Sequence, residues 1–270
     1  MTRKILAILM TSFVLATGDA QAQCGSVNNA FSSGETISYD LYFNWKFVWK
    51  KVGSASWNIM RTYYNGQPAY KTYLITRGLP QSDRYFMMRD TLTSYTDLNL
   101  SPLYYSKHAK EGKDFRVEDV WYSYPKGQCS LKMRFRKNDK PVQNNTFTSK
   151  YCAYDMISMI LRARSFDVSK MKVGQRTNFL LAEGKHCEWR QLIYKGKQVV
   201  KMENTNNRYR CLVFSYVEKD GGKEKTVVTF YVTDDESHLP VRLDLNLRFG
   251  SAKAFMRGAT GLRHQIKSKI

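Results

Sequence analysis

The chain has 270 residues, of which 43 are Lys or Arg and 23 are Asp or Glu, which gives a formal net charge of +20. Hydrophobic residues make up 43% and aromatic residues 14%, so the chain holds enough apolar side chain to exclude a disordered protein. Five cysteines spread over this length argue against a small disulfide scaffold. The length allows one large β domain or two ordinary domains.

The first 22 residues have the three regions of a secretory signal peptide. Arg3 and Lys4 form a basic start, residues 5–15 form a short apolar core, and Ala20-Gln21-Ala22 forms a cleavage site. The apolar core is shorter than the roughly 20 residues of a membrane span. A short N-terminal core helix is the alternative. We expect residues 1–22 to be removed and the protein to reach the periplasm or the outer-membrane periphery without a transmembrane span.

Alternating polar and apolar residues dominate the mature chain. Residues 36–43, 225–232 and 241–249 each alternate with the period of two that is typical of a half-buried strand. Turn signals punctuate these runs, including Asn65-Gly66 and Asp220-Gly221-Gly222. The spacing predicts an antiparallel meander of about a dozen or more strands.

One helix is predicted over residues 155–165, where the alternation stops. Asp155 is suited to cap its start, and Met156, Ile160 and Ala163 fall on one helical face, with Ile157 and Leu161 beside them. Because the sequence shows no linker, we expect one domain over residues 23–270, with the helix between two sets of strands. So many antiparallel strands must curl into a sandwich or an open or closed barrel. A barrel of more than about eight strands is too wide for its own side chains to fill, which predicts a cavity.

Export permits disulfides. Cys129 and Cys152 flank a predicted hairpin centred on residues 138–141, and equal steps outward from its turn place them nearly opposite, so this pair is the disulfide candidate. Cys187 and Cys211 form a less natural pair, and Cys24 is left over. Gln23 precedes Cys24 where a lipoprotein signal has a small residue, which disfavours a lipid anchor. Buried free thiols are the alternative for all five cysteines.

The search for catalytic motifs finds no nucleophile elbow, zinc-protease motif, phosphate-binding loop or dinucleotide fingerprint. The four histidines lie far apart along the sequence, and the acidic run 234–236 lacks the spacing of a calcium loop, so a solvated turn is favoured. We therefore predict no catalytic residue, metal or cofactor. Arg84, Arg89 and Asp90 form a charged group on a predicted strand that is rich in aromatic residues. They are either polar groups at a ligand site or a structural ion pair.

The positive charge is spread over the mature chain. Lys132, Arg134 and Arg136 alternate with apolar residues and form a basic stripe on one face of a strand. Such a stripe is compatible with nucleic acid, but an exported protein meets little of it. Anionic lipid headgroups, lipopolysaccharide phosphates or acidic glycans are better partners, and a basic surface without a specific partner is the alternative.

Short motifs recur in a familiar order along the chain. They comprise Gly34-Glu35, Val52-Gly53-Ser54-Ala55, Asp90-Thr91-Leu92-Thr93-Ser94-Tyr95, Leu100-Ser101-Pro102, Tyr154-Asp155-Met156-Ile157-Ser158 with Arg162, Asp234, His238-Leu239-Pro240-Val241-Arg242 and Phe249-Gly250-Ser251-Ala252-Lys253-Ala254. Together they resemble domain-of-unknown-function family 3108, exported proteins of Gram-negative bacteria, over about residues 31–257. The resemblance implies an antiparallel barrel similar to a capsule-assembly lipoprotein, without an established activity.

Three functions are compatible with these observations. The first is a non-enzymatic monomer of the envelope that binds a lipid or glycan in a barrel cavity. The polar residues expected at that site are Arg84, Arg89, Asp90, Asp155, Arg162 and Arg242. The second is an interaction module that docks an anionic envelope partner through its basic surface. The third is a hydrolase that uses carboxylates such as Asp90 and Asp155.

Overall fold

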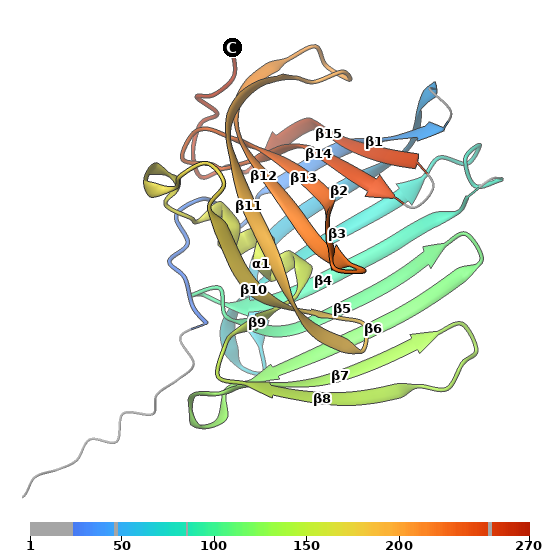
Figure 1. Cartoon of the computed structure of the whole chain (residues 1–270), viewed down its shortest axis with the longest axis vertical. Helices are drawn as coiled ribbons and strands as arrows, with labels where there is room; N and C mark the ends of the chain where they lie inside the picture. The colour runs from blue at the N-terminus through green and yellow to red at the C-terminus, as the bar shows by residue number, and fades with distance from the viewer. Residues whose placement is uncertain (1–23, 46–47, 85, 248–249) are drawn as a thin grey trace, which may run out of the picture.

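The computed structural model describes residues 24–45, 48–84, 86–247 and 250–270 (Figure 1). The predicted signal peptide at residues 1–22 lies outside this part. The first strands are β1 (Thr36–Trp45), β2 (Val48–Tyr64), β3 (Gln67–Gly78), β4 (Met88–Asp97), β5 (Pro102–Glu111), β6 (Asp114–Ser123), β7 (Cys129–Lys137), β8 (Gln143–Ser149) and β9 (Ala153–Tyr154). Helices are α1 (Met156–Arg164) and the 3-10 turns η1 (Pro125–Gly127) and η2 (Val168–Lys170). The remaining strands are β10 (Arg176–Glu183), β11 (His186–Lys201), β12 (Arg208–Asp220), β13 (Lys223–Thr233), β14 (Pro240–Leu247) and β15 (Gly250–Thr260).

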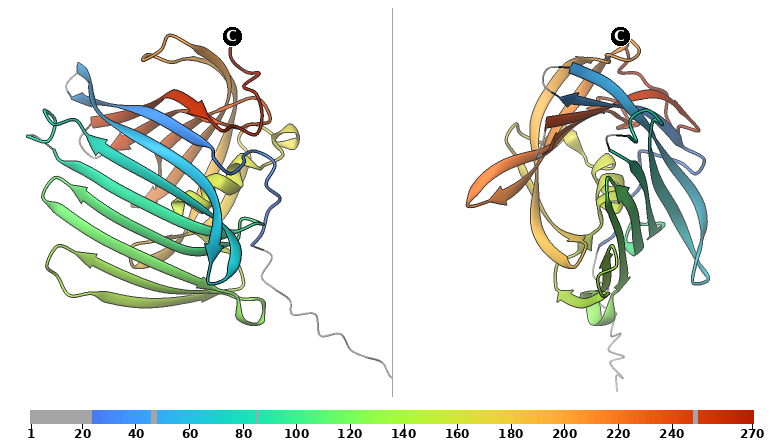
Figure 2. Two further views of the ribbon diagram at one scale, coloured as in Figure 1. Left: turned by 180° about the vertical axis from the view of Figure 1, so that it is seen from behind. Right: turned by 90° about the vertical axis from the view of Figure 1, so that its right-hand side faces the viewer.

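Within the described residues all fifteen strands belong to one sheet, in the order β8-β7-β6-β5-β4-β3-β2-β1-β15-β14-β13-β12-β11-β10-β9. Neighbours are antiparallel except β9 and β10, and β1 pairs with β15, so two meanders join where the first and last strands meet. Figures 1 and 2 show the sheet curving round until its two ends face each other. The predicted meander and barrel are confirmed, with an unsealed seam between β8 and β9.

Tight turns produce this topology, because each strand must reverse within a few residues. Asn65 and Gly66 adopt φ values of 49° and 78° between β2 and β3, which is the left-handed backbone that a two-residue hairpin turn requires. Gly221 and Gly222, at 56° and 80°, do the same between β12 and β13. The sequence signals for both turns are confirmed.

The predicted helix at residues 155–165 is confirmed as α1, enclosed by the curved sheet (Figure 2). Of the predicted apolar face, Ile160 and Ala163 pack against the core, but Met156 does not. Ile157, Met159 and Leu161 are buried, whereas Met156 is 42% exposed. A short helix enclosed between two walls buries more than one stripe, so the apolar stripe of a surface helix does not describe it. Across the described part of the chain, no helix is long and apolar enough to cross a membrane.

Two apolar clusters pack against α1. The larger contains Ile157 and Leu161 with inward side chains of β1–β7, such as Trp57 and Leu92. The smaller contains Met159 with side chains of β10–β12. The helix therefore fills one end of the barrel, and the strands extend beyond it toward the other end.

The predicted pairing of Cys129 with Cys152 is wrong, because Cys152 forms a disulfide with Cys24. In the hairpin of β7 and β8, Cys129 lies opposite Ser149, so Cys152 falls three residues beyond the ladder, in the turn to β9. There it meets the N-terminal segment. Cys24, which the sequence left unpaired, is thereby tied to the seam, and Cys129, Cys187 and Cys211 are free thiols.

Candidate ligand site at the open end of the barrel

The end of the barrel away from α1 has an apolar inner lining that is not fully buried. Leu41 of β1 and Leu243 and Leu245 of β14 alternate with outward-facing neighbours and lie on the inner face of their strands. Each is partly exposed, whereas the inward residues around α1 are buried. We call this region the open end. Apolar side chains that face inward and still contact solvent are suited to binding an apolar molecule.

Polar groups line the β4–β6 wall of the open end. Asp90 of β4 is 8% exposed, and its Oδ2 accepts a hydrogen bond of 3.0 Å from Thr76 Oγ1. Among the described residues its Oδ1 has no hydrogen-bond partner. Burial raises the pKa of Asp90, and the like charge of Glu111 raises it further, while the hydrogen bond from Thr76, the charge of Lys107 and a backbone hydrogen bond from Lys110 oppose the rise. This wall therefore presents a buried carboxyl oxygen that is ready to accept a hydrogen bond.

Glu118 of β6 links this wall to the far side of the seam. Its Oε2 accepts a hydrogen bond of 3.0 Å from the backbone N–H of Gly184, in the turn between β10 and β11. In the same turn, Lys185 O accepts a bond of 3.2 Å from Asn145 Nδ2 of β8. Burial raises the pKa of Glu118, and Lys107 lowers it. The β10–β11 turn therefore bridges the seam, and Lys107 acts electrostatically on both buried carboxyls.

The opposite wall carries a second polar chain. Arg190 Nε of β11 donates to the Tyr216 hydroxyl at 3.1 Å, and this hydroxyl donates to Glu218 Oε1 at 2.8 Å. Burial and the negative charge of Glu218 raise the pKa of Tyr216. The negative charge of Glu183 raises the pKa of both Tyr216 and Glu118. Its carboxylate therefore acts on both walls, so the two polar chains flank one region.

Asp155, predicted at the site, instead caps α1. Its Oδ1 accepts the backbone N–H of Ile157 and of Ser158, each at 2.9 Å, and its Oδ2 accepts from Ser94 Oγ at 3.0 Å. Burial raises its pKa, although these bonds oppose the rise. Because its carboxylate oxygens are occupied by hydrogen bonds within the fold, Asp155 has a structural role as the cap of α1.

The predicted arginines do not converge on one site either. Arg89 is exposed and pairs with Asp83, because alternation along β4 turns it away from Asp90; Arg84 is also exposed, in the preceding turns. Arg162 Nη1 donates to Cys24 O at 2.9 Å and so holds the N-terminal segment. Of the six residues predicted to form a site, only Asp90 faces the open end.

Arg242, the sixth predicted residue, lies on the outer face. Its guanidinium binds both carboxylate oxygens of Asp244, at 2.7 and 2.6 Å. It lies 5.0 Å from the ring centroid of Tyr231 and 5.3 Å from that of Phe255. The alternation that places Leu243 inside the barrel places Arg242 outside it.

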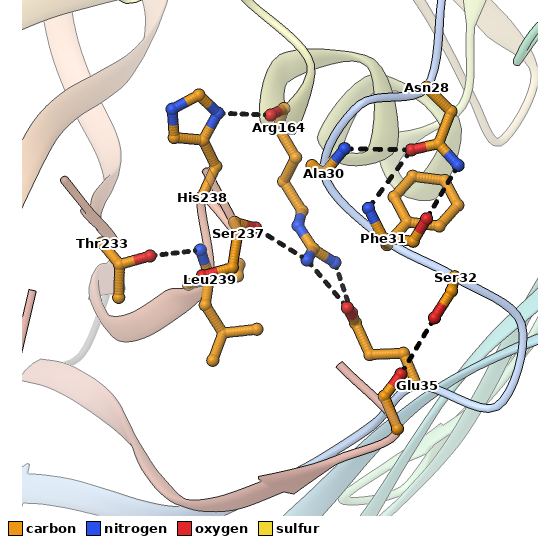
Figure 3. Close-up of polar contacts among 12 residues, drawn as sticks. Asn28, Ala30, Phe31, Ser32, Glu35, Arg164, Thr233, Ser237, His238 and Leu239 are labelled. Atoms are coloured by element: carbon orange, nitrogen blue, oxygen red, sulfur yellow. Dashed lines mark hydrogen bonds and ion pairs between the residues drawn. The ribbon is translucent and has the colours of Figure 1, made fainter. Parts of the chain in front are cut away.

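Sequence reasoning missed a buried charged network at the α1 end (Figure 3). Arg164, 2% exposed, donates through Nη2 to Glu35 Oε2 and to Ser237 O, both at 3.0 Å. Its backbone carbonyl lies 2.5 Å from His238 Nδ1, and its guanidinium lies 5.4 Å from the ring centroid of Phe31. The network ties the N-terminal segment, the end of α1 and the β13–β14 turn together. Glu35 and His238 belong to the motifs that carry the family resemblance, and nothing else in the sequence singled these two residues out.

The acidic run 234–236 is a structural turn. Asp235 accepts hydrogen bonds from the hydroxyls of Thr233 and Ser237 and from the backbone N–H of Ser268. Asp234 pairs with Lys197 at 2.9 Å. Over the part of the chain that the structure describes, no group of three or more metal-ligating side chains gathers.

Comparisons with known proteins agree with the fold. A family model described as "Protein of unknown function (DUF3108)" matches residues 38–257. Among solved structures, the chain is similar to a β-barrel-like protein of the domain of unknown function DUF1849 from Brucella abortus. The TM-score is 0.54 at 12% identity, over 85% of this chain and 98% of that chain, which establishes a shared fold. The comparison with curated proteins gives no match.

Proposed function

The chain belongs to the DUF3108 family, which is defined without an activity, and we propose that it is a non-enzymatic envelope protein that binds a lipid-like molecule at the open end of its barrel. The observation that carries this proposal is the inner apolar lining that remains partly exposed where α1 does not reach. A protein without a ligand gains nothing from leaving such a lining uncovered, because burying it would be favourable.

The polar groups indicate the other end of the ligand. Asp90 Oδ1 is buried and has no partner among the described residues, so a hydroxyl or ammonium group on the ligand would satisfy it. Lys107, which acts on both Asp90 and Glu118, would attract an anionic group beside it. The expected ligand is therefore amphipathic, with an apolar body against Leu243 and Leu245 and a head group that donates a hydrogen bond.

Two observations support export to an oxidising compartment. The predicted signal peptide gives the route, and the disulfide between Cys24 and Cys152 requires a compartment in which thiols are oxidised. A disulfide at Cys24 also occupies the thiol that a lipid anchor would need. We propose the periplasm or the outer-membrane periphery as the location.

The test is native mass spectrometry of the mature protein purified from its own envelope, followed by organic extraction and lipid analysis. We expect a stoichiometric lipid that is lost in Leu245→Glu, which places a charge on the inner lining. Asn246→Glu is the matched control, because the same charge on the next residue faces outward. Asp90→Asn should weaken retention, because an amide replaces the carboxyl group as the acceptor.

A clean unliganded mass that does not change on adding envelope lipids would overturn the proposal. Equal lipid retention in Leu245→Glu and Asn246→Glu would place the lipid elsewhere on the protein. Recovery of a chemically altered lipid after incubation would show turnover, and would favour the hydrolase over the binding protein.

A further inference from the structure

The outer face of β2–β8 carries a straight row of residues in register, on the side opposite the barrel interior. Its members, each paired with the next across neighbouring strands, are Met60, Lys71, Tyr95, Tyr104, Trp121, Lys132 and Thr146. We call the three adjacent aromatic residues, Tyr95, Tyr104 and Trp121, the aromatic row. It runs across the strands, and Lys71 and Lys132 lie at its two ends.

The rings of the aromatic row form a continuous surface. The centroids of Tyr95 and Tyr104 are 6.2 Å apart and those of Tyr104 and Trp121 are 5.6 Å apart, at interplanar angles of 42° and 38°. Tyr64 extends the surface, 5.1 Å from Tyr95. Trp121 is 37% exposed, so part of its ring faces solvent. Tyr64 also stacks on Tyr104, with centroids 6.1 Å apart and planes at 9°, so the surface left to a partner consists of ring edges and the solvent-facing part of Trp121.

Polar contacts hold these rings in place. The Tyr104 hydroxyl donates to Asp119 Oδ1 at 2.5 Å, and Arg134 donates to Asp119 Oδ2 from Nε and Nη2, at 3.0 and 2.8 Å. The Arg134 guanidinium in turn lies 5.6 Å from the ring centroid of Trp121. These contacts preorganise the aromatic row, which lowers the entropy cost of binding a partner.

A second row of side chains runs parallel to the first, one step along each strand. Its members, again paired across strands, are Asn58, Tyr73, Thr93, Ser106, Asp119, Arg134 and Asn144. Ser106 and Asp119 are buried, whereas Asn58, Thr93, Arg134 and Asn144 are partly or fully exposed and carry amide, hydroxyl and charged groups. A flat aromatic surface beside a row of hydrogen-bonding groups matches a sugar polymer, which has C–H faces and hydroxyl edges. A membrane surface would need no such second row.

The charges indicate an acidic partner. Lys71 Nζ lies 5.7 Å from the centroid of Tyr95 and 5.9 Å from that of Tyr73, and Lys132 is exposed beside Trp121. In the described part of the chain neither lysine has a carboxylate partner. We propose that this face binds an acidic polysaccharide, with sugar rings on the aromatic row and its anionic groups at Lys71 and Lys132. The site is independent of the open end, which faces the opposite side of the same strands.

The test measures binding of the full mature protein to hyaluronan oligosaccharides by isothermal titration calorimetry. A cello-oligosaccharide of equal length is the neutral probe, and vesicles of phosphatidylglycerol are the membrane probe. We expect hyaluronan to bind, with affinity falling as salt rises, and to bind more tightly than either other probe. Binding to the vesicles alone, or to none of the probes, would overturn the proposal.

Variants locate the site. Trp121→Ala should weaken hyaluronan binding about tenfold, while Trp121→Phe, which keeps a ring, should retain most of the affinity. Trp189→Ala is the matched control, because Trp189 is 53% exposed on β11, outside the aromatic row. Each variant's thermal midpoint shows that it is folded. Equal losses in Trp121→Ala and Trp189→Ala, or no loss in either, would refute the assignment of the site to this face.

Discussion

The ion pair between Glu35 and Arg164 gives the sharpest test of the structure. Its side chains are 0% and 2% exposed, and both hydrogen-bonded carboxylate oxygens of Glu35 take their bonds from this one guanidinium. Replacing Arg164 with Met would therefore leave a carboxylate buried without a donor. Leaving one member of a buried pair alone costs about 3–5 kcal/mol of unfolding free energy. We expect a loss in this range for Arg164→Met, and a similar loss for Glu35→Leu.

The double variant should behave differently from the sum of the two. With both charges replaced by apolar groups of similar size no charge is left unpaired, and such exchanges are often neutral. The Ser237 carbonyl still loses its donor, which costs about 1–3 kcal/mol. We therefore expect the double variant to lose no more than either single one, so that the coupling free energy is at least about 3 kcal/mol.

Urea unfolding followed by tryptophan fluorescence measures these free energies, since the chain has five tryptophans. The matched control is the pair of Arg176 and Glu224, whose side chains are 45% and 42% exposed. An exposed pair is worth at most about 1 kcal/mol, so Arg176→Met and Glu224→Leu should change stability little. If Arg164→Met costs no more than Arg176→Met, or if the buried pair's losses simply add, the reasoning is refuted.

Three further predictions concern stability. Replacing Cys24 and Cys152 together with Ser should lower the unfolding free energy in guanidinium by about 5 kcal/mol, because the disulfide closes a loop of 128 residues in the unfolded chain. Asp155→Ala should cost about 2 kcal/mol in urea unfolding, because it removes the cap of α1 and leaves the Ser94 hydroxyl unpaired. Asp90 has a raised pKa when folded, so its ionisation opposes folding. The unfolding free energy of the wild type relative to that of Asp90→Asn should therefore fall as pH rises from below 3.8 through that raised pKa, which a pH series on both proteins measures.

Each of these has an outcome that would contradict it. A Ser double variant within about 1 kcal/mol of the wild type would mean that the disulfide does not constrain the unfolded chain. For the cap, Asp167→Ala is the control, because Asp167 caps only the short turn η2 and is exposed; an equal loss in both variants would remove the special role of Asp155. Parallel pH curves for wild type and Asp90→Asn would show that Asp90 is not buried as described.

The sequence by itself determined the local elements. Alternation along residues 241–249 predicts a strand that the structure contains as β14 up to Leu247, with residues 248–249 outside the described part, and the Asn65-Gly66 turn predicts a hairpin that it also contains. Both predictions succeed because side-chain period and turn chemistry act within a few residues. The capping residue Asp155 was predicted for the same reason, since its side chain bonds to Ile157 and Ser158, two and three residues further along its own chain. The order of short motifs further identified the family.

Only the tertiary structure decided which groups meet. Cys24 and Cys152 are 128 residues apart, and Glu35 and Arg164 are 129 apart, so no local pattern relates either pair. The face that α1 buries also depends on having a wall on each side of it. Asp90 and Arg89 are neighbours in sequence, yet one faces the open end and the other faces solvent. That choice is made by the direction in which the whole sheet curls, which depends on all of its strands together.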